Sequence, residues 1–366
     1  MMDFLTVLLW ILAIGAIIRL HTAFWTRYFG NPRFGDQVHF AQTADGWRIA
    51  LHRYLPRERK YAEPLVLCHG MGANRHNFDM GDDRSLAREL SARGFDVWVI
   101  ELRGSGLSSR PRLFSRYKAN YSFDDHLKLD IPSGIDLVRR VSGHESLFWI
   151  GHSMGGMLGY ALSGQGKENG LAGLVTVSAP VVLSAGSARW THHLIRPMTV
   201  GRTIAFRPVA RFFSPFLGWG PGWISRIVVR PDGMEGSFLR RCMVDLTENT
   251  AGKLMRQFFS WIRSGKFESL DGDTDYLANL SKLEQPILII AADADNIAVP
   301  QSVTPAYERI RSEDKQLRIF GTDRGDDHDF GHGDIMLGTQ SGAIVYPEII
   351  DWLEQRASER DPGNYS

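Results

Sequence analysis

At 366 residues and 41.2 kDa, the chain is long enough to bury a large core, either in one domain with an insertion or in two domains. Its net charge of +1 gives no general attraction to nucleic acid, so we expect no nucleic-acid partner. The two cysteines, Cys68 and Cys242, are too few for a disulfide framework or a metal-ligand cluster, and we expect both to be buried and reduced.

The chain begins with an apolar run over residues 4–18, FLTVLLWILAIGAII. A bilayer needs about 20 residues, and the run reaches Trp25 if the Arg19 side chain extends back toward the lipid headgroups. The leader before the run holds no lysine or arginine, and no signal-peptide cleavage site stands out. We therefore predict an uncleaved transmembrane anchor over residues 1–27, with a buried or surface-lying helix as the alternative.

Basic residues on one side of this run predict the direction of the anchor. Arg19, Arg27 and Arg33 all follow the apolar residues. Cytoplasmic segments beside membrane helices are enriched in lysine and arginine. We therefore predict a single-pass membrane protein whose main body lies in the cytoplasm.

Residues 28–180 alternate between strand and helix patterns. A hairpin over residues 37–55 turns at Asp45-Gly46, and a charged linker follows over residues 56–63. Short apolar strands are predicted at residues 65–68, 96–102, 146–150 and 174–177, with helices at residues 85–93, 122–141 and 154–163. Ser122 is suited to cap the long helix, and Pro132 is expected to kink it. This alternation predicts an α/β fold in which a mostly parallel sheet is covered by helices on both faces.

The alternation stops between residues 181 and 284, which are rich in aromatic residues and arginine. From Gly186 to Cys242 there are nine arginines and two acidic residues, interleaved with aromatic residues such as Trp190, Trp219 and Trp223. We predict a helical cap, or lid, over the carboxyl edge of the sheet, with helices and no strand between them. Its arginine-aromatic surface suits apolar acyl chains or an anionic bilayer, although the aromatic residues could equally form the cap's own core.

The sheet pattern resumes over residues 285–357. Strands are expected at residues 286–292 and 316–320, and a closing helix at residues 342–355. The polar residues 358–366 are predicted to be a disordered tail.

One motif at a strand-to-helix junction carries the chemistry. Gly151-His152-Ser153-Met154-Gly155 follows an apolar strand, and this context is typical of a sharp turn that exposes a nucleophilic serine. A serine needs a base, and the base needs an orienting acid. His152, beside the serine, is interpreted as a structural residue that shapes the turn.

The expected acid and base follow the serine in chain order. Asp295 comes after the next strand and His332 after the last one, within Phe330-Gly331-His332-Gly333-Asp334. Asp293 is the alternative acid and His328 the alternative base. The oxyanion formed during acyl transfer needs preorganised N–H donors, for which we predict the backbone N–H groups of Met154 and Met71.

Several motifs together resemble the α/β-hydrolase superfamily, over roughly residues 38–180 and 285–357. They are His69-Gly70-Met71-Gly72, Glu101-Leu102-Arg103-Gly104-Ser105-Gly106, Gly151-His152-Ser153-Met154-Gly155-Gly156, Asp295-Asn296-Ile297-Ala298-Val299-Pro300 and Gly331-His332-Gly333-Asp334. The helix around Ser122 and Asp130, the His332-x-Asp334 pair and the large cap are similar to the acid-lipase and esterase branch. The resemblance implies ester hydrolysis through an acyl-serine intermediate, without a metal ion or an organic cofactor.

Three hypotheses follow for function. The first is a membrane-anchored serine esterase that acts on small-molecule or lipid esters with an apolar acyl chain. The second is an acyltransferase or thioesterase with the same Ser-Asp-His triad, and an aminopeptidase-like amidase is a further variant. The third is a catalytically silent, membrane-bound binding protein. The sequence predicts neither the acyl length nor the oligomeric state.

Overall fold

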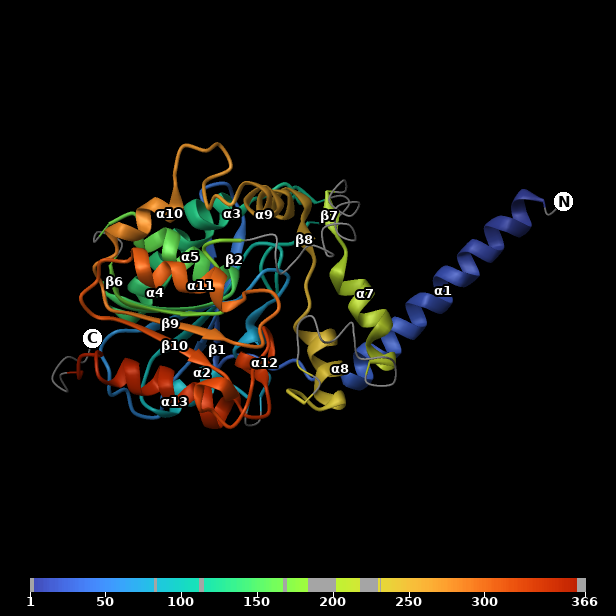
Figure 1. The fold of residues 1–366 in the computed structure, drawn as a ribbon. Coiled ribbons are helices and arrows are strands. Elements are labelled where there is room, and N and C mark those ends of the chain that lie inside the picture. The colour runs from blue at the N-terminus through green and yellow to red at the C-terminus, as the bar shows by residue number, and fades with distance from the viewer. Residues whose placement is uncertain are drawn as a thin grey trace.

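Strands from both halves of the chain form one central sheet, in the order β1-β2-β4-β3-β5-β6-β9-β10 (Figure 1). The computed structural model describes residues 3–81, 84–111, 115–166, 170–183, 202–217, 230 and 232–360. Strand β2 is antiparallel to β1 and β4, and the other neighbours are parallel. The strands are β1 (Gln37–Gln42), β2 (Arg48–Tyr54), β3 (Leu65–Cys68), β4 (Val97–Glu101), β5 (Leu147–His152), β6 (Leu171–Val177), β9 (Ile287–Ala292) and β10 (Lys315–Phe320).

Both faces of the sheet are packed, because neighbouring residues of a strand point to opposite sides. In β5, Trp149 joins the hydrophobic cluster on one face, and Phe148 and Ile150 join the cluster on the other. Figure 1 shows α4, α5 and α11 over one face and α2 and α13 over the other. The covering helices are α2 (Leu86–Ala92), α4 (Ile131–Ser142), α5 (Met154–Ser163), α11 (Pro300–Arg309) and α13 (Ser341–Glu354). The predicted α/β class and its layers are confirmed.

The long helix predicted over residues 122–141 is one continuous element with a wide turn inside it. Ser122 caps segment α3 (Phe123–Asp125), as predicted, and Asp125 bonds back to the Ser122 N–H to complete a capping box. A π-helical turn, η2 (His126–Asp130), then joins it to α4, and Pro132 stands in the first turn of α4. Proline has no N–H and its ring collides with the carbonyl four residues earlier, so the wider turn gives the ring its space.

Between β6 and β9 the described residues form mainly helices, as predicted for the insertion. They are α7 (Phe206–Phe213), η5 (Ser214–Phe216), α8 (Gly236–Asp245), α9 (Gly252–Ser264), α10 (Tyr276–Asn279) and η7 (Leu280–Lys282). The prediction that no strand lies among them was wrong, because β7 (Thr203–Ile204) pairs antiparallel with β8 (Thr250–Ala251). β-Branched residues favour this pairing, but two residues are too few to give a periodic pattern. Trp190, Trp219 and Trp223 of the predicted aromatic surface lie outside the described residues.

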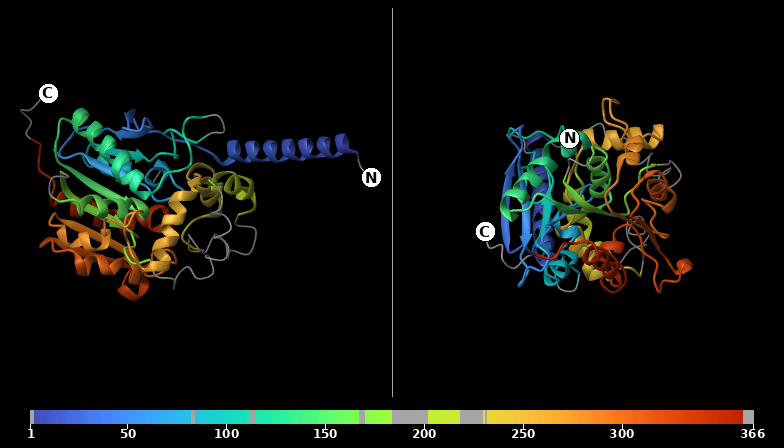
Figure 2. Two further views of the ribbon diagram at one scale, coloured as in Figure 1. Left: turned by 90° about the horizontal axis from the view of Figure 1, so that it is seen from above. Right: turned by 90° about the vertical axis from the view of Figure 1, so that its left-hand side faces the viewer.

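Helix α1 (Phe4–Phe29) projects away from the body (Figure 2). It is long and apolar enough to cross a membrane, a property that signal sequences share. Its end packs on the insertion, where the His21 ring lies 4.8 Å from the ring of Phe212 and 6.0 Å from that of Phe216. The apolar residues 4–18 therefore extend free of the body, whereas the last turns of α1 lie against it.

The chain after α13 is ordered further than the sequence predicted. Residues 358–360 were expected to be disordered, but the Ser358 N–H donates to Glu63 Oε2 and the Arg360 N–H donates to the Lys60 carbonyl. An antiparallel bridge between Tyr61 and Glu359 completes the pairing. Residues 358–360 are thus fixed by backbone pairing with the linker after β2, a contact that their polar composition does not reveal. The rest of the predicted tail, residues 361–366, lies outside the described residues.

Candidate active site

The turn between β5 and α5 places Ser153 in a strained conformation. Ser153 has φ 54° and ψ −121°, one of two non-glycine residues with positive φ in the described chain. A Cβ at Gly155 would lie 2.0 Å from the Cys68 carbonyl oxygen, and one at Gly151 would lie 2.3 Å from the backbone of Gly155. Only glycine fits at these two positions, so the chain can turn sharply against β3. Strain of this kind costs about 1–3 kcal/mol and persists where the surrounding structure holds it.

The structure brings Ser153, His332 and Asp295 into one hydrogen-bonded row. His332 Nε2 lies 3.0 Å from Ser153 Oγ, and its Nδ1 lies 2.8 Å from Asp295 Oδ2. His332 precedes the short helix α12 (Asp334–Leu337), and Asp295 follows β9. The three side chains therefore come from the segments that follow three different strands, β5, β9 and β10, as expected for a site beyond the carboxyl ends of a parallel sheet.

The buried Asp295 carboxylate is held ionised by its surroundings. Burial disfavours its charge, but the His332 ring and the N–H groups of Ala298 and Ile297 outweigh this effect and lower the pKa of Asp295. Both N–H groups donate to Oδ1 at 2.8 Å, which leaves Oδ2 for His332. The carboxylate is thus fixed in orientation and can fix the imidazole in turn.

The alternative acid and base lie in other contacts. Asp293 Oδ2 accepts a 2.9 Å hydrogen bond from Arg324 Nε, and the two form an ion pair near the surface. Arg324 lies in η8 (Thr322–Arg324), the turn that follows β10. His328 packs edge-on against the Phe330 ring, at 5.1 Å between ring centroids. The structure does not bring Asp293 or His328 to Ser153.

His152 does more than the sequence interpretation assigned to it. Its Nε2 donates a 2.9 Å hydrogen bond to the backbone carbonyl of His332, and its Nδ1 lies 2.9 Å from Asn77 Oδ1. Asn77 belongs to η1 (Arg75–Asn77). Burial, and next the charge of His332, lower the pKa of His152 to about 3, so the ring is neutral at ordinary pH. The neutral ring has one N–H, which donates to the His332 carbonyl, so His152 holds the loop that carries His332 and lies against Asn77 of the η1 turn.

The loop over residues 69–72 lies directly against Ser153. A Cβ at Gly70 would be 3.1 Å from the Cβ of Ser153. His69 Nδ1 donates to the Gly70 carbonyl at 2.8 Å, and the Gly70 N–H donates to Asn77 Oδ1 at 3.1 Å. Within the described part of the chain, no hydrogen-bond partner is found for the backbone N–H of Met71 or of Met154. Two donors are therefore available on the two segments that flank the serine.

Two buried glutamates, to which the sequence analysis assigned no individual role, hold this loop and the η1 turn that follows it. Glu101 Oε1 accepts a 3.0 Å hydrogen bond from Arg75 Nη1, and Oε2 lies 3.2 Å from His52 Nε2. Burial disfavours the Glu101 charge, but His52 and Arg75 outweigh it and hold the pKa well below its usual value. Glu248, from the insertion, donates its N–H to the Gly72 carbonyl at 2.7 Å and accepts from Asn74 Nδ2 at 3.0 Å. The insertion is thus tied to the loop beside Ser153.

No metal centre is evident in the described chain, where no group of three or more histidine, cysteine, aspartate or glutamate residues could hold an ion. Cys68 and Cys242 are both free thiols and both buried, as the sequence predicts.

Comparison with known proteins points to one superfamily. The profile of a family described as "Serine aminopeptidase, S33" matches residues 60–323, a range that includes Ser153 and Asp295 and ends before His332. Gastric triacylglycerol lipase of Bos taurus is 26% identical over 372 residues, which cover 90% of this chain and 89% of the lipase. A poly(3-hydroxyalkanoate) polymerase subunit of Haloferax mediterranei is 26% identical over 84% of this chain, but this chain spans only 62% of that subunit's length.

Solved structures agree on the fold. A structure described as a membrane phospholipase A and bacterial virulence factor has a TM-score of 0.57 and 18% identity to this chain. The similarity covers 95% of this chain and 96% of the other. At this identity the likeness demonstrates the fold alone.

Proposed function

The chain belongs to the serine aminopeptidase S33 family of the α/β-hydrolase superfamily, and on this basis we propose that it is a serine hydrolase that cleaves carboxylic esters. The observation that carries the proposal is the position of His332, which contacts both Ser153 Oγ and Asp295 Oδ2. Ser153 is the nucleophile, His332 the general base and acid, and Asp295 the residue that orients the imidazole. The lipase relative supports an ester as the substrate.

In the proposed first half-reaction, His332 Nε2 takes the proton of Ser153 Oγ as the oxygen attacks the ester carbonyl carbon. The carbonyl oxygen becomes an oxyanion, which the N–H groups of Met71 and Met154 stabilise. Collapse of this intermediate breaks the bond to the alcohol oxygen, which takes the proton from His332 and leaves. Ser153 then carries the acyl group as an ester.

The second half-reaction repeats these steps with water. His332 accepts a proton from water while the water oxygen attacks the acyl carbon. The tetrahedral intermediate breaks its bond to Ser153 Oγ, which regains the proton. Because Asp295 stays ionised, it stabilises the imidazolium formed in both halves.

The proposed substrate class is a lipid or another ester with an apolar acyl chain. Helix α1 would place the enzyme at a membrane, and beside it Val209 and Phe213 of α7 and Phe216 of η5 are each exposed over about half of their surfaces. One relative is named a triacylglycerol lipase and one structural neighbour a membrane phospholipase A. We propose α1 as a single-pass anchor with the catalytic body in the cytoplasm, because Arg19, Arg27 and Arg33 follow the apolar residues.

The test is the initial rate of nitrophenyl ester hydrolysis as the acyl chain is lengthened, with wild type and Ser153→Ala compared. Loss of the nucleophile is expected to lower kcat by about 10⁴-fold or more. A serine-dependent rate that rises toward long chains supports the lipid-like substrate, and a rate limited to short chains supports a plain esterase. Residual turnover of Ser153→Ala above about 1% of wild type would contradict the assignment of the nucleophile.

A second candidate is acyl transfer with the same residues. It is favoured by one observation, the similarity to a polymerase subunit over 84% of this chain. The same acyl-serine would then be attacked by an alcohol in place of water. Adding a primary alcohol to the ester assay distinguishes the two, because a transferase forms a new ester faster than free acid. The family description also motivates an aminoacyl nitroanilide as a substrate for amidase activity.

A further inference from the structure

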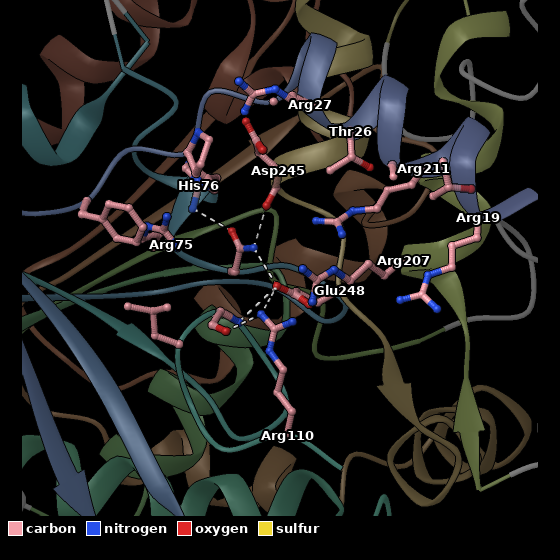
Figure 3. A pocket seen from close by; sticks show the side chains of 18 residues that line it. Arg19, Thr26, Arg27, Arg75, His76, Arg110, Arg207, Arg211, Asp245 and Glu248 are labelled. Carbon is pink, nitrogen blue, oxygen red and sulfur yellow. Dashed lines mark hydrogen bonds and ion pairs between the residues drawn. The ribbon is translucent and has the colours of Figure 1, made fainter. Parts of the chain in front are cut away.

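A cavity of about 830 Å³ lies where the end of α1 meets the body of the molecule, and we call it the arginine pocket. Figure 3 shows Arg19 from α1 and Arg207 and Arg211 from α7 on one side of it, with Glu248 near its centre. Ser153, Asp295 and His332 do not line it. Its lining contains six arginines, namely Arg19, Arg27, Arg75, Arg110, Arg207 and Arg211, and two acidic residues, Asp245 and Glu248.

The two carboxylates do not neutralise these arginines. Glu248 forms ion pairs with Arg110 (Nη2 to Oε1, 2.8 Å) and with Arg207 (Nη1 to Oε2, 3.3 Å). One carboxylate is therefore shared by two guanidinium groups. Asp245 Oδ2 accepts from the Asn31 N–H at 2.8 Å and lies 3.8 Å from Arg241, which does not line the pocket. The pocket therefore carries an excess of positive charge.

Among the residues that the structure describes, no carboxylate pairs with three of the pocket's guanidinium groups, those of Arg19, Arg27 and Arg211. Arg211 donates to the backbone carbonyl of Val244, at 3.2 and 3.1 Å. Burial lowers the pKa of the Arg211 guanidinium, and the nearby charge of Arg207 lowers it further. The side chains of Arg19 and Arg27 form no hydrogen bond or ion pair with any residue that the structure describes. A planar guanidinium group binds phosphate oxygens through two parallel N–H donors, so several of them around one cavity suit a phosphate group.

The position of the pocket on α1 identifies the source of such a phosphate. One face of α1 lines the cavity, because its lining residues are three or four positions apart: Arg19, Ala23, Thr26 and Arg27. Arg19 directly follows the apolar run, and Arg27 lies about 12 Å further along the helix. This stretch matches the headgroup zone of a bilayer that residues 4–18 enter.

We propose that the arginine pocket binds the phosphate group of an anionic membrane lipid. Phosphate recognition follows from the charges of the pocket, and the lipid source rests on the proposed insertion of α1. Glu248 lines the pocket and also donates its N–H to the Gly72 carbonyl, so a lipid bound there contacts a residue that holds the loop beside Ser153.

The test measures binding in full-length protein that carries Ser153→Ala, so that no lipid is hydrolysed and a failed ester assay leaves this test intact. In neutral detergent, the thermal midpoint is followed while short-chain phosphatidylglycerol, phosphatidylcholine or inorganic phosphate is added. Phosphatidylglycerol is expected to raise the midpoint at the lowest concentration. Arg19→Gln combined with Arg211→Gln should weaken its binding by about tenfold or more, because charge-assisted contacts are lost.

Two further variants control for a general loss of surface charge and for misfolding. Arg140→Gln combined with Arg263→Gln removes two exposed arginines that do not line the pocket, and it should bind like wild type. Arg27→Gln changes one exposed, unpartnered side chain, so weaker binding there does not arise from misfolding. Equal binding of phosphatidylglycerol and phosphatidylcholine, or equal binding by the pocket and control variants, would overturn the site. Inorganic phosphate binding as tightly as phosphatidylglycerol would overturn the lipid source.

Discussion

Asp295 and Asp293 stand two residues apart, yet only one of them reaches the imidazole of His332. Asp295 is buried and accepts two backbone N–H groups, whereas Asp293 is paired with Arg324 near the surface. Burial and fixed hydrogen bonds are what allow a carboxylate to select one tautomer of a histidine. The two positions therefore form a matched pair for testing the proposed acid.

We predict that Asp295→Asn lowers kcat on nitrophenyl esters by about 10⁴-fold, because the amide cannot hold the imidazole in the required tautomer. Asp293→Asn should stay within about twofold of wild type, since only a surface ion pair is lost. Steady-state kinetics of both variants, with circular dichroism to check folding, decides the matter. The reverse ranking would move the acid to Asp293.

The catalytic candidates were predictable from the sequence, but the residues that hold them were not. Ser153, Asp295 and His332 each follow a readable strand, in the order that the fold requires. Asn77 and Glu248 follow no such pattern, because their partners lie far away in the chain: Asn77 meets His152 and Glu248 meets Gly72. A local pattern carries no information about contacts that only folding creates.

At the scale of elements, Glu101 joins the end of β4 to β2 and to the η1 turn. Its carboxylate is fully buried and contacts Arg75 and His52, and the Leu107 N–H donates to it at 2.5 Å. Removing one partner of a buried ion pair leaves the other charge uncompensated, at a cost of about 3–5 kcal/mol. This network supports the turn that carries Asn77 and, through it, the loop at residues 69–72.

Glu101 should make stability depend on pH in a defined direction. Its pKa is lowered in the folded protein from the reference value of 4.5, so its stabilisation is present above that value and is lost as the pH falls below it. We predict that Glu101→Gln reduces the free energy of unfolding near neutral pH. The difference from wild type should shrink when the pH is lowered below about 4.5. Urea denaturation at several pH values measures this difference in the free energy of unfolding.

A surface glutamate provides the control for this prediction. Glu268 lies 3.8 Å from the exposed Lys266, and Glu268→Gln should change the free energy of unfolding by no more than about 1 kcal/mol at any of these pH values. A constant difference between wild type and Glu101→Gln at all pH values would show that the lost packing, and not the charge, is responsible.

The elements of the sheet were predictable because apolar runs and turn signals mark them, whereas the insertion was predictable only in outline. Strand β3 reads as four consecutive apolar residues, all of them buried. The β7–β8 pairing joins segments far apart in the chain. The π-helical turn before Pro132 depends on the clash between the proline ring and the backbone carbonyl four residues earlier. Pairing between distant short segments leaves almost no trace in local composition.

At the scale of the whole molecule, α1 has two parts with different surroundings. Residues 4–20 rise by about 25 Å, somewhat less than the apolar thickness of a bilayer of about 30 Å. The last turns pack on α7, where His21 meets Phe212 and Trp25 stacks on Phe29 within α1. With α1 inserted as proposed, so short a span would draw the body against the membrane and bring the exposed Phe213 and Phe216 to the headgroup level.

Two truncations separate these parts. A protein lacking residues 1–20 should leave the membrane fraction at high salt, because the apolar segment is gone, and keep its thermal midpoint, because His21 and Trp25 remain. A protein lacking residues 1–29 uncovers Phe212 and should be less stable by about 1–3 kcal/mol. Membrane fractionation and thermal unfolding measure the two effects, and wild type is the reference for both.

Salt then distinguishes an anchor from a surface attachment. The shorter truncation retains the basic and aromatic side chains of α7, so we expect it to float with phosphatidylglycerol vesicles at low salt and to detach when salt is raised, since screening weakens contacts between exposed charges. Persistence in the membrane fraction at high salt would contradict α1 as the anchor and would place the attachment in the insertion. Equal stability of the two truncations would show that the packing of α1 on α7 contributes little to the fold.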